Sequence, residues 1–141
     1  IIKFFDNQLV VNPGNADDLD FLFKYNIQRF GVESVFFDSR RQQVIKNFLN
    51  TNLNWQILRF TLNHQIQAVS LSVFYRNTYI YLNAGSNLSE VPNLGTYVIL
   101  KNITQAINLK ADIFDAGFED LGWKQRFHLE PTPLYTLINA T

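Results

Sequence analysis

The sequence predicts an α/β domain in which a mixed, mostly antiparallel sheet is flanked by helices. Segments with apolar residues at helical spacing alternate with short β-rich segments, and glycine, proline and asparagine turn signals separate them. The resulting element order is β-α-α-β-β-β-α-β-α-β. The chain has 141 residues, of which 47% are apolar, and this is enough for one buried core. Residues 1–141 are therefore expected to form a single domain.

The N-terminal third is expected to hold one strand and two helices. Residues 3–11 are rich in phenylalanine, leucine and valine, which indicates a strand, and an Asn-Pro-Gly turn follows. Asn15 is a suitable N-cap for a helix over residues 19–30, where apolar residues recur at helical spacing up to a glycine. A second helix is expected to begin at a capping box in residues 39–42.

The middle of the chain reads as three β-rich segments joined by tight turns, followed by the longest helix. Alternating apolar residues predict strands over residues 55–62, 66–75 and 78–83. Residues 95–109 place isoleucine and alanine on one face and predict a helix. The expected C-terminal elements are a short strand over 111–116, a short helix or turn over 120–127 and a final strand over 134–139.

Composition excludes several classes of function. Twelve basic and twelve acidic side chains cancel, so the charge does not favour DNA or an anionic membrane as the main partner. The absence of cysteine excludes disulfides, thiolate zinc sites and cysteine nucleophiles. No stretch of ~18 apolar residues predicts a membrane span, and no signal peptide is visible, so we expect a cytoplasmic protein. Because Ile1 stands first and no methionine occurs, the chain is expected to be a processed product or a fragment, such as one half of a longer protein.

The start of the longest helix offers a candidate anion site. Its residues are Asn93, Gly95, Thr96 and Tyr97. A helix N-terminus has unpaired amides and about half a positive charge, which together can hold a phosphate. The glycine would let the backbone approach the anion closely. An ordinary helix start is the alternative, because no P-loop motif accompanies the glycine.

Acidic residues gather at the end of the predicted short strand. Asp115 follows two apolar residues, and Glu119 comes shortly after it. A carboxylate at the end of a buried strand suits a general base, but an aspartate in that place also caps turns. No calcium loop or histidine pair accompanies these residues, so no metal is expected.

Cations and aromatic rings alternate in residues 123–128. Lys124 and Arg126 are candidates for contact with an anionic group of a ligand. The alternative is an amphipathic turn, in which Trp123 and Phe127 dock on the domain and the two cations lie in solvent. No further basic residues extend this pattern into a nucleic-acid surface.

The C-terminal part resembles the GNAT acyltransferases, and in particular their FemABX-like branch, which includes acyltransferases associated with cellulose and exopolysaccharide synthesis. That branch carries a strand of the type F-D-F-G, then Y/F-K-x-x-F/W-G, then E-P-x-P-L. Residues 114–117 read F-D-A-G, residues 123–127 read W-K-Q-R-F and residues 130–135 read E-P-T-P-L-Y. The likeness covers residues 15–139, and the element order is also that of the GNAT fold.

The resemblance implies transfer of an acyl group from acyl-CoA, such as acetyl-CoA, to an amine of a small molecule or a cell-envelope precursor. In such folds two parallel strands part, and the donor lies in the gap between them. Here the parting would fall between residues 78–83 and 113–116. The donor pyrophosphate would meet the helix that begins near Gly95.

The resemblance also implies roles for individual residues. Backbone amides near Asn83 would polarise the thioester carbonyl. Asp115 or Glu119 would take the proton of the incoming amine, directly or through water. Lys124 would contact a phosphate or a carboxylate of the substrate.

Departures from the family pattern keep alternatives open. The pyrophosphate loop lacks the basic residue that is usual in acetyl-CoA enzymes, which leaves aminoacyl-tRNA as another donor. The rival function is that of a non-catalytic, degenerate GNAT domain that binds a ligand or a partner subunit. A homodimer or a second GNAT lobe is the expected protein partner. A carbohydrate-binding module with exposed rings at Tyr79 and Tyr81 is disfavoured by the helices.

Overall fold

Two tight hairpins join the three long strands in the middle of the chain. The computed structural model describes residues 2–117 and 122–138. In the first turn Asn63 and His64 have φ angles of 49° and 65°, and in the second Arg76 and Asn77 have φ angles of 48° and 58°. Turns with two left-handed residues match the twist of the strands that they connect, and asparagine tolerates this conformation well. Both predicted hairpins are confirmed.

In the described residues, five strands form one sheet and four α-helices accompany it. The strands are β1 (Leu9–Pro13), β2 (Asn54–Leu62), β3 (Gln65–Tyr75), β4 (Thr78–Ser86) and β5 (Ile113–Asp115). The helices are α1 (Ile2–Gln8), α2 (Leu19–Phe30), α3 (Ser39–Phe48) and α4 (Leu94–Asn108). The short 3₁₀ turns are η1 (Ala16–Asp18), η2 (Gly31–Glu33) and η3 (Lys124–Phe127).

The strands lie in the order β1-β2-β3-β4-β5. Neighbouring strands from β1 to β4 run antiparallel, and β5 runs parallel to β4. The predicted fold class, a mixed and mostly antiparallel sheet flanked by helices, is therefore confirmed. From β1 to β5 the chain also follows the predicted order β-α-α-β-β-β-α-β.

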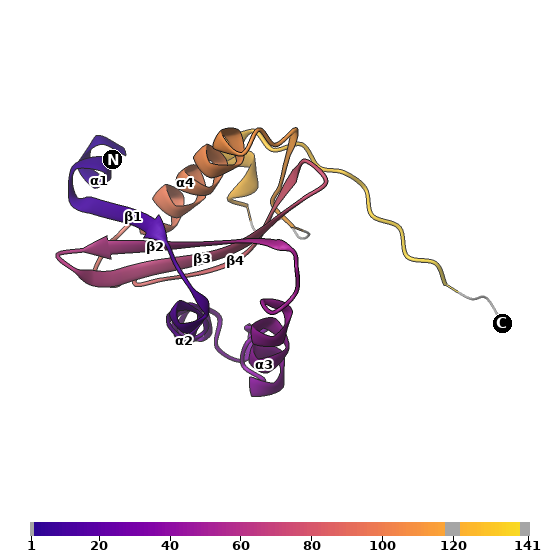
Figure 1. Ribbon diagram of the computed structural model, residues 1–141, viewed down its shortest axis with the longest axis horizontal. Coiled ribbons are helices and arrows are strands. Elements are labelled where there is room, and N and C mark those ends of the chain that lie inside the picture. Colours follow the sequence, from indigo (N-terminus) through magenta and orange to yellow (C-terminus); the bar gives the residue numbers. More distant parts are fainter. Residues whose placement is uncertain (1, 118–121, 139–141) are drawn as a thin grey trace.

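Helices cover both faces of the sheet (Figure 1). α1 and α4 lie on one face, and α2 and α3 lie on the other. Because side chains alternate along a strand, β3 sends Ala68 to the first face and Val69 to the second. The core on the α4 side contains Phe5, Leu9, Leu58, Phe60, Ala68, Val91, Leu94, Tyr97 and Val98. The core on the α2 side contains Leu19, Leu22, Phe23, Phe36, Val69 and Leu71.

A buried polar cluster fixes the middle of α4 on the sheet. The side-chain oxygen of Asn102 accepts hydrogen bonds from the hydroxyl groups of Tyr79 (2.8 Å) and Ser72 (3.1 Å). Its amide group donates to the Ser70 hydroxyl (2.9 Å) and to the Val98 carbonyl (2.8 Å). Buried polar groups are tolerated when they hold partners, so this cluster joins α4 to β3 and β4 without a desolvation penalty for unpaired groups.

Helix α2 packs unusually closely on the last residues of β4. A Cβ atom on Gly85 would lie 2.7 Å from the Cα atom of Leu22 and closer still to its carbonyl oxygen. One turn further along α2, the amide of Asn26 donates a hydrogen bond to the Ala84 carbonyl at 3.2 Å. Only glycine permits this approach, so residue 85 allows α2 to support the end of β4.

The N-terminal prediction is wrong in its first part. Residues 2–8 form helix α1, and only the end of the predicted strand over residues 3–11 belongs to β1. Asp6 accepts hydrogen bonds from the Tyr97 hydroxyl (2.8 Å) and forms an ion pair with Lys101 (2.7 Å). These partners lie on α4, so the contacts that favour a helix here are not visible in the local sequence.

The helix caps agree with the sequence at α2 and differ at α3. Asn15 forms the capping box with Asp18 at the turn that leads into α2, as its identity predicts. At α3 the N-cap is Asp38, whose carboxylate accepts a hydrogen bond from the Arg40 amide at 2.9 Å. The predicted capping box at residues 39–42 is therefore wrong by one position, because aspartate is an equally good cap.

Beyond β5 the chain departs from the prediction. The predicted strand over residues 134–139 is not formed by residues 134–138, whose apolar side chains are exposed, and residue 139 lies outside the described residues. Of the predicted helix over residues 120–127, the structure describes the turn η3. No described helix combines the length and the apolar character needed to cross a bilayer.

Candidate functional site

Strands β4 and β5 pair over a short stretch, and β4 continues as a strand beyond it. The paired residues are Thr78 with Ile113, Tyr79 with Phe114 and Ile80 with Asp115. β4 continues to Ser86 and remains paired with β3 on its other side. We call this place the fork: residues 81–86 of β4 on one side, and residues 115–117 at the end of β5 on the other. The pairing thus ends at Ile80 and Asp115, where a parting of the strands is predicted, and Gly117 still lies near Tyr81, with 3.8 Å between an added Cβ atom and the Tyr81 carbonyl oxygen.

An irregularity in β4 lies directly at the fork. Ser72 of β3 pairs with Tyr81, whereas the preceding Leu71 pairs with Asn83, so Leu82 is an extra residue without a partner on β3. Such a bulge bends a strand and redirects its backbone groups. Asn83, a predicted substrate-binding residue, therefore lies immediately after the bulge on the strand that borders the fork.

Helix α4 begins shortly after β4 ends. Its N-cap residue, Asn93, has a left-handed backbone (φ 65°) and makes no side-chain cap. The amides of Thr96 and Tyr97 point to the Asn93 carbonyl at 3.1 and 3.5 Å. Within the described chain, the Gly95 amide has no hydrogen-bond partner. A Cβ atom on Gly95 would meet only the end of the Leu88 side chain, at 3.9 Å, so the space above it is open.

The four residues predicted to bind the donor at this helix start differ in exposure. Asn93 and Thr96 are exposed, and Gly95 is partly exposed. Tyr97 is buried, and its ring packs on Phe5 at 5.0 Å between centroids. Tyr97 thus belongs to the core, and its hydroxyl is directed at α1 and not at the helix start.

Asp115 and Lys124 meet at one turn beside the fork. The Asp115 carboxylate accepts a hydrogen bond from the Gly117 amide at 2.8 Å, and the Lys124 ammonium donates to the Gly117 carbonyl at 2.6 Å. The two groups therefore hold the turn that follows β5. Arg126 is exposed on η3. Glu119, the other predicted catalytic residue, lies outside the described residues.

A row of aromatic rings borders the fork. The sequence indicates two of its parts separately, the Tyr79 and Tyr81 pair on one strand and the Trp123 and Phe127 pair in the C-terminal turn, but not their contact. Phe114 stacks with Tyr79 and with Tyr81, at centroid distances of 5.8 and 6.2 Å. Trp123 then meets Tyr81 edge-on at 6.3 Å and Phe127 at 6.1 Å. The two-residue spacing of the tyrosines on one strand is the sequence signal that indicates a shared face.

Among these rings, the phenol of Tyr81 has the pKa that is shifted furthest from its ordinary value. Burial raises the pKa of its phenol far above the usual value, and the neighbouring Tyr79 adds to the rise. The guanidinium of Arg29, at the end of α2, acts on the Tyr81 pKa in the opposite direction. A phenol of this kind stays protonated at neutral pH and can donate a hydrogen bond.

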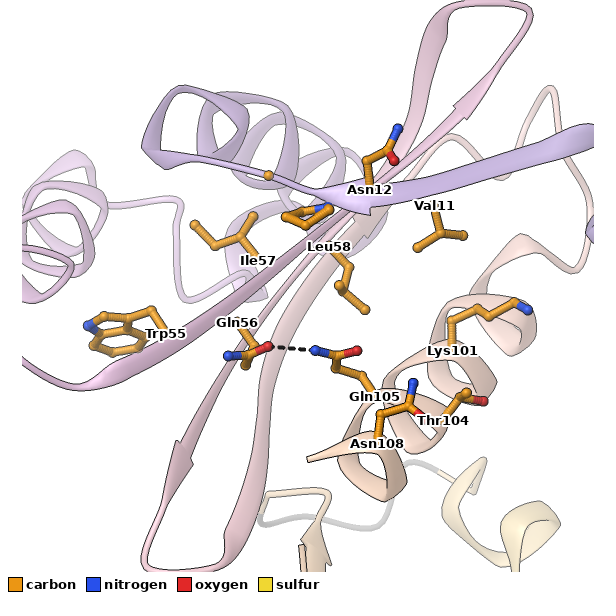
Figure 2. Close-up of a pocket in the computed structure, with 12 residues that line it drawn as sticks. Val11, Asn12, Trp55, Gln56, Ile57, Leu58, Lys101, Thr104, Gln105 and Asn108 are labelled. Carbon is orange, nitrogen blue, oxygen red and sulfur yellow. Dashed lines mark hydrogen bonds between the residues drawn. The ribbon is translucent and has the colours of Figure 1, made fainter. Parts of the chain in front are cut away.

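A separate groove lies at the other end of α4 (Figure 2). It has a volume of about 380 Å³ and runs between α4 and the strands β1 and β2. Gln105 of α4 donates a hydrogen bond to Gln56 of β2 across it, at 2.9 Å. None of the predicted site residues lines this groove. The fork and the groove are therefore distinct features at opposite ends of one helix.

The described residues contain no group of three or more histidine, aspartate or glutamate side chains placed to hold a metal ion. The fork instead combines an open strand edge, a helix start with a free amide, a ring-lined wall and one carboxylate. Such an arrangement can hold an extended ligand along the strand with an anionic group at the helix start.

Comparison with known proteins gives a match in structure alone. No protein-family model and no curated protein matches the sequence. The chain is similar to a possible acetyltransferase from Clostridium difficile 630, with a TM-score of 0.68, 14% identity, and 95% of this chain and 98% of that chain covered. It is also similar to the aminoglycoside acetyltransferase meta-AAC0020 from an uncultured soil metagenomic sample, solved with sisomicin (TM-score 0.67, 12% identity, 97% and 99% covered).

A third similar structure was solved with a donor. It is a predicted acetyltransferase from Clostridium acetobutylicum with acetyl-CoA (TM-score 0.65, 15% identity, 93% and 96% covered). At these identities the similarity shows the fold, which is that of the GNAT acetyltransferases.

Proposed function

We propose that this chain transfers an acyl group from acyl-CoA to an amine. The single observation that carries the proposal is the fork, where pairing between β4 and β5 stops at Ile80 and Asp115 while β4 runs on toward the start of α4. An acetyltransferase of the same fold was solved with acetyl-CoA. The finer assignment to the FemABX-like branch, with a small-molecule amine or a cell-envelope precursor as acceptor, is part of the same proposal.

The start of α4 fits the anionic part of such a donor. Gly95 offers a free amide at the positive end of a helix, and the open space above it allows a phosphate to approach the backbone. The connection between β4 and α4 contains no lysine or arginine and carries Glu90. The donor would therefore be held by backbone amides and the helix dipole, with Asn93 and Thr96 beside it, and we expect modest affinity.

The chemistry requires two events at the fork. The amine nitrogen forms a bond to the thioester carbonyl carbon, and the electron pair of the carbonyl passes to its oxygen. Backbone amides near Asn83, exposed by the bulge in β4, would stabilise that charge. The intermediate then expels the CoA thiolate, which takes up a proton, while the proton of the amine passes to Asp115 or to water.

Lys124 and Arg126 complete the proposed site. The Lys124 ammonium already donates a hydrogen bond to the Gly117 carbonyl in the turn after β5. To bind substrate, Lys124 would have to exchange this hydrogen bond for one to the substrate. Arg126 lies exposed on the same 3₁₀ turn and is the freer candidate for an anionic group of the substrate. Glu119 remains the alternative base.

A second candidate function rests on a specific observation. The carboxylate of Asp115 and the ammonium of Lys124 are both engaged in the protein's own turn. This arrangement favours a GNAT-like domain without catalysis, which would bind a ligand, a second lobe or a second copy of the chain. The proposal of a single domain over residues 1–141 is compatible with both functions.

Titration calorimetry with acetyl-CoA and longer acyl-CoAs tests the proposed donor site. The informative variant is Gly95→Asp, because an aspartate in the first turn favours the helix but repels a pyrophosphate. Two negative charges at roughly 5 Å from a carboxylate in water weaken binding by about 1.7 kcal/mol, or more than tenfold. Gly95→Asn is the neutral control of equal size. Equal acyl-CoA affinity for the two variants, or no binding by the parent protein at millimolar ligand, would argue for the non-catalytic function.

A further inference from the structure

The groove between α4 and the strands β1 and β2 plays no part in the proposed acyl transfer. Its volume of about 380 Å³ lies at the lower end of the range of small-molecule sites, roughly 300–1,000 Å³. Figure 2 shows Val11 of β1, Leu58 of β2, and Lys101 and Gln105 of α4 around its open centre. The groove is therefore large enough for a ligand of one or two rings.

The groove lies where polar residues take the place of core residues between α4 and the sheet. On β2, side chains that face α4 alternate as Phe60, Leu58 and Gln56; the first two are buried in the core, and Gln56 is partly exposed. On α4, Gln105 and Asn108 lie one turn apart on the side of the groove. Apolar side chains at these positions would extend the core, whereas the polar ones leave a hollow that a ligand can fill.

The lining of the groove carries almost no unbalanced charge. Among the described residues that line it, Lys101 is the one with a charged side chain, and its ammonium forms an ion pair with Asp6 at 2.7 Å. A charged ligand would lose hydration in the groove without finding a free opposite charge. The lining therefore selects an uncharged ligand.

Two glutamine side chains orient each other and leave hydrogen-bonding groups for a ligand. The Gln105 amide donates to the side-chain oxygen of Gln56 at 2.9 Å, and the Gln56 amide donates to Asn54 at 2.7 Å. Within the described chain, the side-chain oxygen of Gln105 accepts no hydrogen bond, and the carboxamide of Asn108 forms none. Because a carboxamide has two donor hydrogens and one acceptor oxygen, this wall of the groove can donate and accept at neighbouring points.

The opposite wall of the groove ends at the edge of the sheet. β1 is the last strand there, and the Gly14 amide donates to the Ile57 carbonyl of β2 at 2.8 Å. Hydrogen bonding alternates along an antiparallel pair, so the backbone amide and carbonyl of Val11 point away from β2. β1 has only five residues and ends at Pro13, which lacks an N–H, so this edge is poorly suited to pairing with a peptide strand. It suits a small ligand that needs few hydrogen bonds.

We propose that this groove binds a small uncharged polyhydroxy compound, a mono- or disaccharide, whose hydroxyl groups meet Gln105, Asn108 and the backbone of Val11. A hydroxyl group both donates and accepts, which matches the adjacent donors and acceptors of these groups. The carbon face of the sugar ring packs on Leu58 and on the Val11 side chain, the apolar part of the lining. The groove is separate from the fork, so the inference does not depend on acyl transfer.

Saccharide binding is measured by NMR on ¹⁵N-labelled protein without acyl-CoA. Glucose and cellobiose are titrated, with cyclohexanol as a ring that keeps a single hydroxyl group and glucuronate as a charged sugar. We expect millimolar binding of the two saccharides, with shifts of the side-chain amide signals of Gln56 and Gln105 and of the Val11 backbone amide. Cyclohexanol should bind about tenfold more weakly than glucose, which corresponds to ~1.4 kcal/mol, or one to two hydrogen bonds. Glucuronate should bind no more tightly than glucose.

Variants locate the site. Gln105→Leu should weaken cellobiose binding about tenfold, because it removes a carboxamide from the groove at nearly constant size. Gln43→Leu is the matched control and should leave binding unchanged, since Gln43 donates to Asn47 at 3.0 Å on the exposed side of α3. Asn108→Ala removes an exposed side chain that has no hydrogen bond in the described chain, so it should weaken binding without disturbing the fold.

Three results would overturn the inference. The first is that millimolar glucose and cellobiose shift no signal of the groove. The second is that cyclohexanol binds as tightly as glucose, or glucuronate more tightly, because the hydroxyl groups or the neutral lining would then not determine the ligand. The third is that Gln105→Leu and Asn108→Ala both keep the parent affinity for cellobiose. A separate acetyl-CoA titration tests the fork, and its outcome leaves the saccharide result unaffected.

Discussion

Replacing Gly85 by alanine should push α2 away from the strand edge that borders the fork. The added Cβ atom would lie 2.7 Å from the Cα atom and 2.9 Å from the carbonyl carbon of Leu22. Carbon atoms prefer separations of about 3.5–4.0 Å, so the helix must retreat by roughly 1 Å. The obstructing atoms belong to the backbone, and no side-chain rotation relieves the contact.

The free-energy change follows from three contributions. Overpacking of this kind costs about 1–3 kcal/mol. Retreat of the helix also stretches the hydrogen bond from Asn26 to Ala84, which is already 3.2 Å long, and its loss costs about 1 kcal/mol more. Alanine lowers the conformational entropy of the unfolded chain relative to glycine, and this offsets about 0.4–1 kcal/mol of the loss. The net expectation for Gly85→Ala is a loss of about 1–3.5 kcal/mol.

Urea unfolding followed by circular dichroism measures this loss. With a slope of about 2 kcal/mol per molar urea, the midpoint should fall by roughly 0.5–2 M. Gly95→Ala is the matched control, because its Cβ atom would meet only a side-chain methyl group at 3.9 Å. The control should hold or raise the midpoint, since alanine favours a helix over glycine by about 0.5–1 kcal/mol. An unchanged midpoint for Gly85→Ala would refute the close packing of α2 on β4.

Three further predictions address other parts of the molecule. Asp6→Asn should lower the urea midpoint at pH 7 and leave it unchanged in strong acid. Hydrogen bonds from Lys101 and Tyr97 hold the pKa of the Asp6 carboxyl below 3.8 in the folded protein. The carboxylate therefore stabilises the fold above that pH, and this stabilisation is lost as the pH falls through the pKa of the folded state. A difference that persists at pH 2 would contradict this linkage. Asp115→Ala should reduce kcat by about 10²–10⁴ if the carboxylate is the base, with a melting temperature within a few degrees of the parent, because it removes only an exposed turn bond; a large fall in melting temperature would identify a structural role. Asn102→Leu should destabilise by about 3 kcal/mol or more in denaturant melts, since it leaves several buried hydroxyl groups unpaired, whereas removal of one hydroxyl by Tyr79→Phe should cost less than half as much.

Local patterns in the sequence predict those elements whose stability is local. The hairpins at residues 63–64 and 76–77 follow from turn-forming residues between alternating strands, and α4 follows from its apolar period. The strand predicted over residues 3–11 fails because Phe5 and Leu9 fit both a strand and one face of a helix. The ion pair between Asp6 and Lys101, far apart in sequence, accompanies the helix.

Some features of the candidate site can likewise be predicted from the sequence, and others depend on the fold. The helix start near Gly95 is predictable from local sequence, and α4 begins at Leu94. The parting of the strands is implied by the family resemblance, and the pairing of β4 with β5 ends at Asp115. The role of Asp115 in the adjacent turn was one of the two alternatives that its position allows, and the structure contains that bond. The aromatic row depends on which elements meet in the fold, because Trp123 lies against Tyr81 although the two residues are far apart in the sequence.

The fork can exist only if β4 stays in the sheet after its pairing with β5 has ended. An edge strand without a partner on one side tends to fray or to pair with another chain. Here β4 keeps its pairing with β3, and on one face of the sheet α2 contacts its end at Gly85 and Ala84. On the other face, α4 is fixed through the buried Asn102 cluster to Tyr79, just before the fork. The edge of β4 that has no partner on β5 is thus supported from both faces. A site of this kind depends on glycine at position 85 as much as on any polar residue at the fork, and Gly85→Ala should therefore weaken acyl-CoA binding although it lies on the face of the sheet opposite α4.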